Sequence, residues 1–488
     1  MFILFLIYLI HKPLRILRPF FTFGVECISS CTLMDDRLQC VRWSYESIDE
    51  MKSWLYIVIF ALVLASCGEY NQEFQSFDPT TNPTANLAPM QRKLKGAIVH
   101  TDFARLIRTS VMTSPNTAAG MVSVLAARSR ILAEQAATLP LIEAESSLTS
   151  DGDAVPILRL SQIIYDGGKV KSRVELRQIE SRRIWLSELS ELSELSFEAV
   201  EAIIELDRNR RLEEQALQNL LRTDHLVKDL QSRFDGGAGS IADLLAGQGR
   251  KSNAETELAQ AKTDVELATA TWVELFGTRP EVIPIIPSAP VLTTSSFQEM
   301  IERSPRLRSQ VTVSQIRKQE LLVAERATRP TLSAILETDF DQGTFSDVAQ
   351  ARLGVLVPIY QGGAARANVA TARFDLQRSI AVEEELRREL QRTLSQSSEE
   401  ASSIKRQLST ARHAVDINEQ ALEAARRQFD IGRTTLVQIL DALRELNQAH
   451  VRVIHLEAQA RRAEYAMLAV TGDILDALGV LRPSDPTL

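Results

Sequence analysis

Cysteine is almost missing from this chain of 488 residues. The four that occur all lie near the amino terminus, at Cys27, Cys31, Cys40 and Cys67. The remainder of the chain therefore has no disulfide, no thiolate metal site and no cysteine nucleophile. His450 and His455, the closest two of the six histidines, are five residues apart and do not share a helix face, so they form a poor metal pair.

The chain also lacks the motifs of common catalytic sites. It has no Walker loop, no HExxH motif and no G-x-S-x-G motif. Its net charge of −8 argues against a nucleic-acid partner, because phosphate binding requires a basic surface. We therefore expect a protein that is not an enzyme, with no catalytic residue, no cofactor, no metal and no nucleic acid.

Glycine and proline are absent from two long stretches, residues 169–235 and 364–431. The chain is 45% hydrophobic, 24% charged and only 6% aromatic, which favours long helices over a compact enzyme core. Each stretch would form a helix about 100 Å long. Charged residues recur throughout both, so we expect helices that pack side by side rather than membrane spans.

Three landmarks recur at a constant spacing of 195 residues. They are Tyr165-Asp166-Gly167-Gly168 with Tyr360-Gln361-Gly362-Gly363, Phe234-Asp235 with Phe429-Asp430, and Gly277 with Gly472. A single offset across so much chain indicates that one long unit is duplicated. The predicted divisions are a first repeat at 96–277, a proline-rich linker at 278–295, a second repeat at 296–472 and a C-terminal tail at 473–488.

Each repeat is predicted to contain a helix, two strands, a long helix and a returning helix. In the first repeat these are residues 97–139, 141–149, 155–165, 169–235 and a helix ending near Phe276. In the second they are residues 296–329, 331–340, 350–360, 364–431 and a helix ending near Val470. The strands are about as long as membrane β-strands of 9–11 residues.

Glycines mark both ends of the long helices. The turns at the far end contain Gly236, Gly237, Gly239 and Gly432, and the strand-to-helix junctions contain Tyr165, Gly167, Gly168, Tyr360, Gly362 and Gly363. We interpret the junction glycines as backbone requirements, and the tyrosines as either interfacial aromatics or junction packing. Ser240 with Asp243, and Thr435 with Gln438, have the spacing of capping boxes.

The amino terminus resembles a targeting signal. A basic residue and an apolar run precede Leu64-Ala65-Ser66-Cys67, which resembles a bacterial lipoprotein signal with Cys67 as the lipidated residue. An ordinary signal peptide is the alternative. In the lipoprotein family Gly68 would favour outer-membrane sorting. Residues 51–66 are thus a predicted signal and 67–95 an extended tether, while 1–50 are either a misassigned upstream extension or a genuine membrane anchor.

Four strand candidates in one chain predict an oligomer. Lipid-exposed strands must close into a barrel, because unpaired backbone groups at an edge have no water to bind. The smallest single-chain barrels have about eight strands, so copies of this chain must be combined. Three chains would supply twelve strands.

The residues at these junctions and turns resemble those of the TolC outer-membrane efflux family. The resemblance extends over residues 95–475 and rests on the two Tyr-x-Gly-Gly segments, on Ala324-Glu-Arg-Ala-Thr-Arg-Pro330 and on the turn from Phe429 to Asp441. It implies a mainly α fold with a small β part, in which a trimer joins a long α-helical barrel to a 12-stranded transmembrane β-barrel. Several members of the family are lipoproteins.

The resemblance also implies a function and partners. Family members are passive exit ducts of tripartite efflux pumps or type I secretion systems. The implied partners are a second and third copy, outer-membrane lipid, a periplasmic adaptor protein and an inner-membrane RND or ABC transporter. The alternative is a structural coiled-coil envelope lipoprotein without a pore, which the strands and the duplication argue against.

Two acids follow the turns at the far end of the long helices. In the resembling family, acids matching Asp243 and Asp441 line the tunnel entrance, and a trimer would turn each into a ring of three carboxylates. We expect Arg433 or nearby polar residues to hold this constriction closed. The alternative is that Asp243 only caps its helix and that Asp441 only favours the positive helix end. Gln438 departs from the family, where another acid is common.

Overall fold

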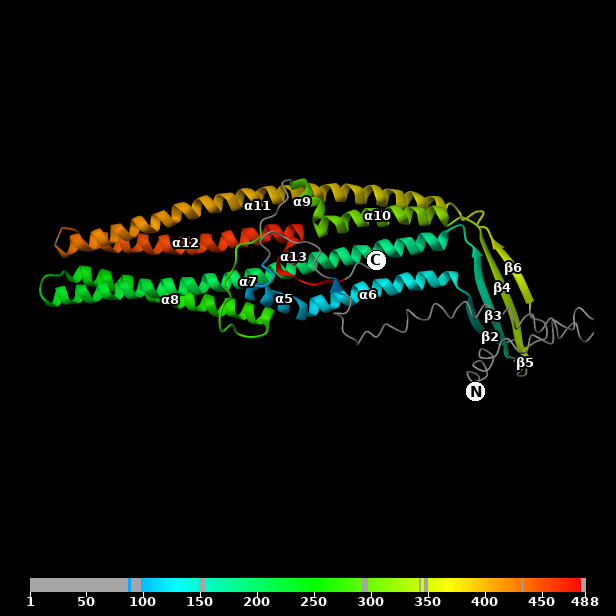
Figure 1. The fold of residues 1–488 in the computed structure, drawn as a ribbon, viewed down its shortest axis with the longest axis horizontal. Coiled ribbons are helices and arrows are strands. Elements are labelled where there is room, and N and C mark those ends of the chain that lie inside the picture. Colours follow the sequence, from blue (N-terminus) through cyan, green and yellow to red (C-terminus); the bar gives the residue numbers. More distant parts are fainter. Residues whose placement is uncertain are drawn as a thin grey trace, which may run out of the picture. The chain divides into compact units, whose positions relative to one another are not determined.

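A computed structural model describes residues 87–88, 98–148, 154–290, 297–341, 344–345, 350–431 and 433–483 (Figure 1). All of them belong to one compact unit, residues 77–488. The predicted lipidation site Cys67 and the turn residue Gly432 lie outside the described residues.

Two helices of 67 residues dominate the chain: α7 (Lys169–Asp235) and α11 (Ala364–Asp430). The first coincides with the predicted stretch and the second is one residue shorter. Each starts after a glycine in the left-handed region, Gly168 with φ 82° and Gly363 with φ 86°, a conformation that a side chain would disfavour. Among the described helices, none is long and apolar enough to cross a membrane.

The returning helices are α8 (Ile241–Phe276) and α12 (Leu436–Thr471), each of 36 residues. They end at left-handed Gly277 and Gly472, which are the residues that mark the duplication. The long and returning helices of the two copies therefore match in length and in the way they end.

The helix that opens each repeat is broken, and its prediction as a single helix is wrong. The pieces are α5 (Asp102–Thr113) and α6 (Pro115–Gln135) in the first copy, and α9 (Phe297–Arg303) and α10 (Pro305–Arg326) in the second. Each break is a Ser-Pro pair, because proline has no N–H for the preceding turn and disfavours helical backbone at the residue before it. Proline is instead well placed as the first residue of the next helix.

The helices lie side by side in a consistent order. Near the sheet, α7 contacts α6 and α10, and α10 contacts α11. Towards the turns, α7 contacts α8 and α12, and α12 contacts α11 (Figure 1). The helices α6 and α8 thus form one lateral edge of the described unit, and α11 forms the other.

Four strands form an antiparallel sheet in the order β2, β3, β4, β6. They are β2 (Leu141–Leu148), β3 (Ala154–Tyr165), β4 (Thr331–Asp341) and β6 (Gln350–Leu356), and the short β5 (Thr344–Phe345) pairs with the end of β4. The hairpins of the two copies join through β3 and β4. Strand β6 ends before the predicted Tyr360, because Pro358 cannot donate a ladder hydrogen bond.

The main core surrounds the middle of α7. Fully buried residues of α7, such as Leu186 and Ile203, pack with Phe103 of α5 and with α13 (Asp473–Leu478). Helix α13 falls within the predicted tail, yet all six of its residues are buried. Beyond it, β7 (Arg482–Pro483) pairs with β1 (Leu87–Ala88), and the Trp185 indole Nε1 donates to the Pro483 carbonyl at 2.8 Å.

Candidate functional site

The first candidate acid, Asp243, lies at the start of α8. It is half-buried and forms no hydrogen bond or ion pair with another described residue. The Ser240 hydroxyl accepts a hydrogen bond from the Ala242 backbone N–H at 3.1 Å. Ser240 therefore caps the helix, but the reciprocal bond of the predicted capping box is not formed, and the Asp243 carboxylate keeps its full hydrogen-bonding capacity.

The second candidate acid, Asp441, lies one turn inside α12. Its side chain is half exposed, and its Oδ1 is 3.5 Å from Nη2 of Arg444 on the same helix. The capping box predicted at the start of α12 is wrong: the Thr435 side chain makes no cap bond, because the Gln438 N–H already donates to the Thr435 backbone carbonyl at 3.1 Å. Gln438 is exposed.

Arg433 does not link the two tip turns through its side chain. Its backbone N–H donates to the Gln428 carbonyl at 2.8 Å and closes the turn after α11, and its side chain is exposed and makes no ion pair with a described residue. The arginine that does connect the copies is Arg233, near the end of α7. Its Nη2 is 3.1 Å from Oδ1 of Asp430, and its Cζ lies 4.3 Å from the centroid of the Phe429 ring.

This tip clamp, formed by Arg233, Phe429 and Asp430, is one-sided. The position 195 residues after Arg233 is Gln428, which cannot form the equivalent ion pair. Beneath the clamp, buried leucines of both hairpins form a shared apolar cluster that includes Leu230, Leu244 and Leu443. The clamp and the cluster thus hold the two tip hairpins of one chain together. In the sequence, only the repeated Phe-Asp pair pointed to this contact.

The strand-to-helix junctions differ between the copies. A Cβ on Gly167 would lie 2.6 Å from the Arg329 Cβ, and Arg329 donates to the Gly167 carbonyl at 2.7 Å. By contrast, nothing lies within 4 Å of a Cβ at Gly362 or Gly363. All four junction glycines have a positive φ, between 59° and 86°, which is a conformation that a side chain disfavours. Tyr165 and Tyr360 are both exposed, and Gly236, Gly237 and Gly239 form the turn after α7.

The sheet has two chemically different faces. Paired residues in an antiparallel ladder point to the same side, so the observed register assigns every residue to a face. One face carries all the charged residues of the four described strands, including Glu143, Glu145, Arg159, Glu337 and Arg352. The opposite face has no charged residue and is mainly apolar, with Ile142, Ala144, Leu158, Leu160, Leu332, Ala334, Leu336, Leu353 and Val355.

Ion pairs cross the charged face from strand to strand. Arg159 on β3 lies directly opposite Glu337 on β4, with Nε 2.6 Å from Oε1. The same carboxylate lies 2.9 Å from Nη2 of Arg352 on β6. On the other side, Nη1 of Arg159 is 3.8 Å from Oε2 of Glu145 on β2. We call these side chains, together with Glu143, the charge ladder.

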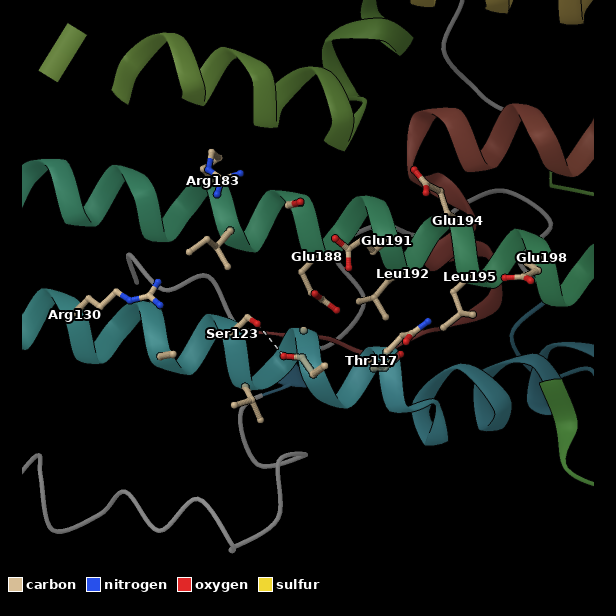
Figure 2. A pocket seen from close by; sticks show the side chains of 17 residues that line it. Thr117, Ser123, Arg130, Arg183, Glu188, Glu191, Leu192, Glu194, Leu195 and Glu198 are labelled. Atoms are coloured by element: carbon tan, nitrogen blue, oxygen red, sulfur yellow. Dashed lines mark hydrogen bonds between the residues drawn. The ribbon is translucent and has the colours of Figure 1, made fainter. Parts of the chain in front are cut away.

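A separate cavity of about 730 Å³ lies between α6 and α7 (Figure 2). Glu188 of α7 points towards α6 and is only 5% exposed, in space left by Gly120, where a Cβ would meet its carboxylate. Burial, and to a lesser degree the neighbouring Glu191 carboxylate, raises the pKa of Glu188 to about 7. Arg130 and Arg183 line the same cavity.

In the part of the chain that the structure describes, no group of three or more histidine, cysteine, aspartate or glutamate residues could hold a metal ion.

The chain is similar to known outer-membrane efflux proteins. The family described as "Outer membrane efflux protein" matches residues 297–473, which correspond to the second repeat. The curated outer membrane efflux protein BepC of Brucella suis is 20% identical over 336 residues, which cover 66% of this chain and 73% of that relative. The resemblance to the TolC-like efflux family is confirmed.

Solved structures agree over most of the chain. The structure of CusC, described with transmembrane channel formation, matches with a TM-score of 0.70 at 14% identity over 81% of this chain and 98% of its own. The outer membrane protein VceC of Vibrio cholerae gives 0.66 at 16% identity over 76% and 96%, and the outer-membrane channel OprN gives 0.69 at 16% over 81% and 95%. The predicted fold class, mainly α with a small β part, is confirmed.

Proposed function

We propose that this protein is an outer-membrane exit duct: a trimeric channel that conducts cargo passively from a periplasmic adaptor and an inner-membrane transporter to the exterior. The observation that carries the proposal is the two-faced sheet. An apolar face suits contact with lipid, and a charged face suits a water-filled lumen, the alternation expected of transmembrane β-barrels.

The free edges of the described unit support closure with further copies of the chain, three in this proposal. Strands β2 and β6 are the two ends of the four-stranded sheet, and α6, α8 and α11 are the lateral ends of the helical layer. A sheet in lipid cannot leave edge N–H and C=O groups unpaired, so β2 of one copy would pair with β6 of the next. Closure of the sheet and of the helices at the same lateral edges gives a continuous tube, with the tip turns at the periplasmic end.

The finer assignments follow from the same proposal. BepC is named an outer membrane efflux protein, and we carry outer-membrane location and export over to this chain on that basis. Cys67 would anchor the amino terminus in lipid, and the periplasmic adaptor would dock at the tip turns. The pump can be an RND efflux transporter or the ABC transporter of a type I secretion system. No catalytic step is required of the chain.

Neighbouring residues on β3 test the membrane orientation. Leu160→Arg places a charge on the apolar face, where arginine costs about 2–4 kcal/mol at the bilayer midplane, whereas Ser161→Arg places it on the charged face. We expect the first to abolish heat-modifiable trimers in outer-membrane extracts. The second should keep trimers and change only ion selectivity in planar bilayers.

The unmodified protein decides between the two candidate functions. A heat-modifiable trimer with ion conductance in planar bilayers supports the duct. A folded lipoprotein that is monomeric, forms no pores and tolerates both arginine variants equally would instead be a structural envelope protein.

A further inference from the structure

The charge ladder alternates in sign from strand to strand. Along the row, β2 carries Glu143 and Glu145, β3 carries Arg159, β4 carries Glu337 and β6 carries Arg352. The inner members are covered by their neighbours: the Glu337 side chain is 17% exposed and that of Arg159 is 37% exposed. The alternation is thus negative, positive, negative, positive across one chain.

The two ends of this row are unfinished. Arg352 sits on the free edge strand β6, has a carboxylate only on its β4 side and remains 55% exposed. At the opposite edge, Glu145 is 64% exposed and is held only at 3.8 Å by Arg159, while Glu143 forms no ion pair with a described residue. One edge therefore ends in a guanidinium and the other in two carboxylates, on the same face of the sheet.

We propose that Arg352 pairs with Glu143 and Glu145 on β2 of a second copy of this chain, so that the ladder closes into a belt of alternating charge inside the barrel. This inference rests on the proposed trimeric barrel. Any pairing of β6 with β2 that slips by one residue would turn Arg352 to the apolar face, where it would meet lipid. A slip by two residues keeps Arg352 on the charged face but moves it along β2, so the belt favours the registers that place Arg352 beside Glu143 or Glu145.

Opposite charges on adjacent strands stabilise a sheet, and like charges placed directly opposite destabilise it. Arg352→Glu would place the new carboxylate beside Glu337 of its own chain and, in the belt, beside Glu143 and Glu145 of the next copy, so four carboxylates would meet at each of the three subunit boundaries. We expect the temperature at which half of the SDS-resistant trimer dissociates to fall by roughly 5–10 °C.

A double-mutant cycle on the full-length protein isolates the contact between copies. The arms are Arg352→Glu, Glu143→Lys, Glu145→Lys and the two double variants. Each lysine also faces Arg159 within its own chain, so the single variants lose stability as well. The readout is the dissociation temperature of the SDS-resistant trimer. We expect at least one double variant to have a clearly higher dissociation temperature than the sum of its two single effects predicts.

Glu337→Gln provides the matched control, because it removes the partner of Arg352 inside the chain. Combined with Glu143→Lys or Glu145→Lys, it should give no recovery: all three carboxylates neighbour Arg159 in their own chain, so the losses should be additive or greater. If Arg352→Glu gives no trimer, recovery of trimers in a double variant supports the belt and continued absence overturns it.

The outcomes separate this inference from the proposed function. If the unmodified protein forms neither trimers nor pores, the proposed exit-duct function is refuted. The belt is refuted if the protein forms conducting trimers and Arg352→Glu does not change their dissociation temperature. It is also refuted if the effects of the single variants are additive in both double variants. In either case the proposed exit-duct function is unaffected.

Discussion

Replacing Glu188 by glutamine should stabilise the packing of α6 against α7 at neutral and alkaline pH. Glu188 is only 5% exposed, and the pKa of its carboxyl group is raised from 4.5 to about 7, mainly by burial. A difference of this size corresponds to roughly 3 kcal/mol between the protonated and ionised states.

The sign follows from linkage. The folded state holds this proton more tightly than the unfolded state, so the stabilisation is fully present below about pH 4.5 and is lost as the pH rises through about 7. Glutamine stays neutral and keeps the shape of the protonated acid. The wild type and the variant should therefore agree at pH 4, separate as the pH rises from about 4.5 to 7, and differ by the full amount above about pH 7.

Hydrogen exchange of the α6 amides measures this difference directly. After correction for intrinsic rates, amides around Gly120 should exchange up to about 100-fold faster in the wild type than in Glu188→Gln at pH 8.5. Glu198→Gln is the matched control, because it lines the same cavity from α7 but is exposed. Equal protection of wild type and Glu188→Gln at both pH values would refute the buried-acid argument.

The remaining predictions concern positions where the two copies differ. Gly472→Ala should lower the melting temperature more than Gly277→Ala. Both glycines have left-handed backbone, but only at Gly472 would a Cβ meet a proline of α10, at 2.7 Å. Equal shifts of the melting temperature would contradict this reasoning. Arg233→Gln and Asp430→Asn should each raise the open probability of the channel in planar bilayers, because each removes a contact worth about 1 kcal/mol or less. The double variant should open no more often than Arg233→Gln alone. Asp441→Ala should weaken the block of channel conductance by divalent cations, and an unchanged block would refute the proposed carboxylate ring.

The long helices could be predicted almost to the residue because their limits are local. A left-handed glycine is needed at each start, and no glycine or proline interrupts the stretch that follows. The same local rule, applied to proline, would have located the helix breaks at Ser114 and Ser304. Those breaks were missed because the apolar periodicity continues across them.

Other features depend on contacts between distant segments and left little trace in the sequence. Helix α13 is short, and its burial depends on α5 and α7, so its composition alone resembles that of a tail. The charge ladder depends on register between strands of different repeats, because Arg159 meets Glu337 only when β3 pairs with β4. The tip clamp likewise joins residues almost 200 positions apart, Arg233 and Asp430, with a separation of 197.

The spacing of the duplication explains where the copies diverge. The Ser-Pro breaks are 190 residues apart, as 304 − 114 shows, whereas the landmarks after the hairpins are 195 apart. Five extra residues therefore lie in the second hairpin, and the long helices beyond it remain equal. Equal helices nevertheless have unequal surroundings. The buried core around α7 draws on α5 and α8 of the first copy and on α12 and α13, whereas α11 is left at a free edge. Six similar repeats in a trimer would therefore be related by threefold rather than sixfold symmetry in the proposed assembly. The tip clamp agrees with this, because each chain has an arginine at position 233 but a glutamine at the equivalent position 428.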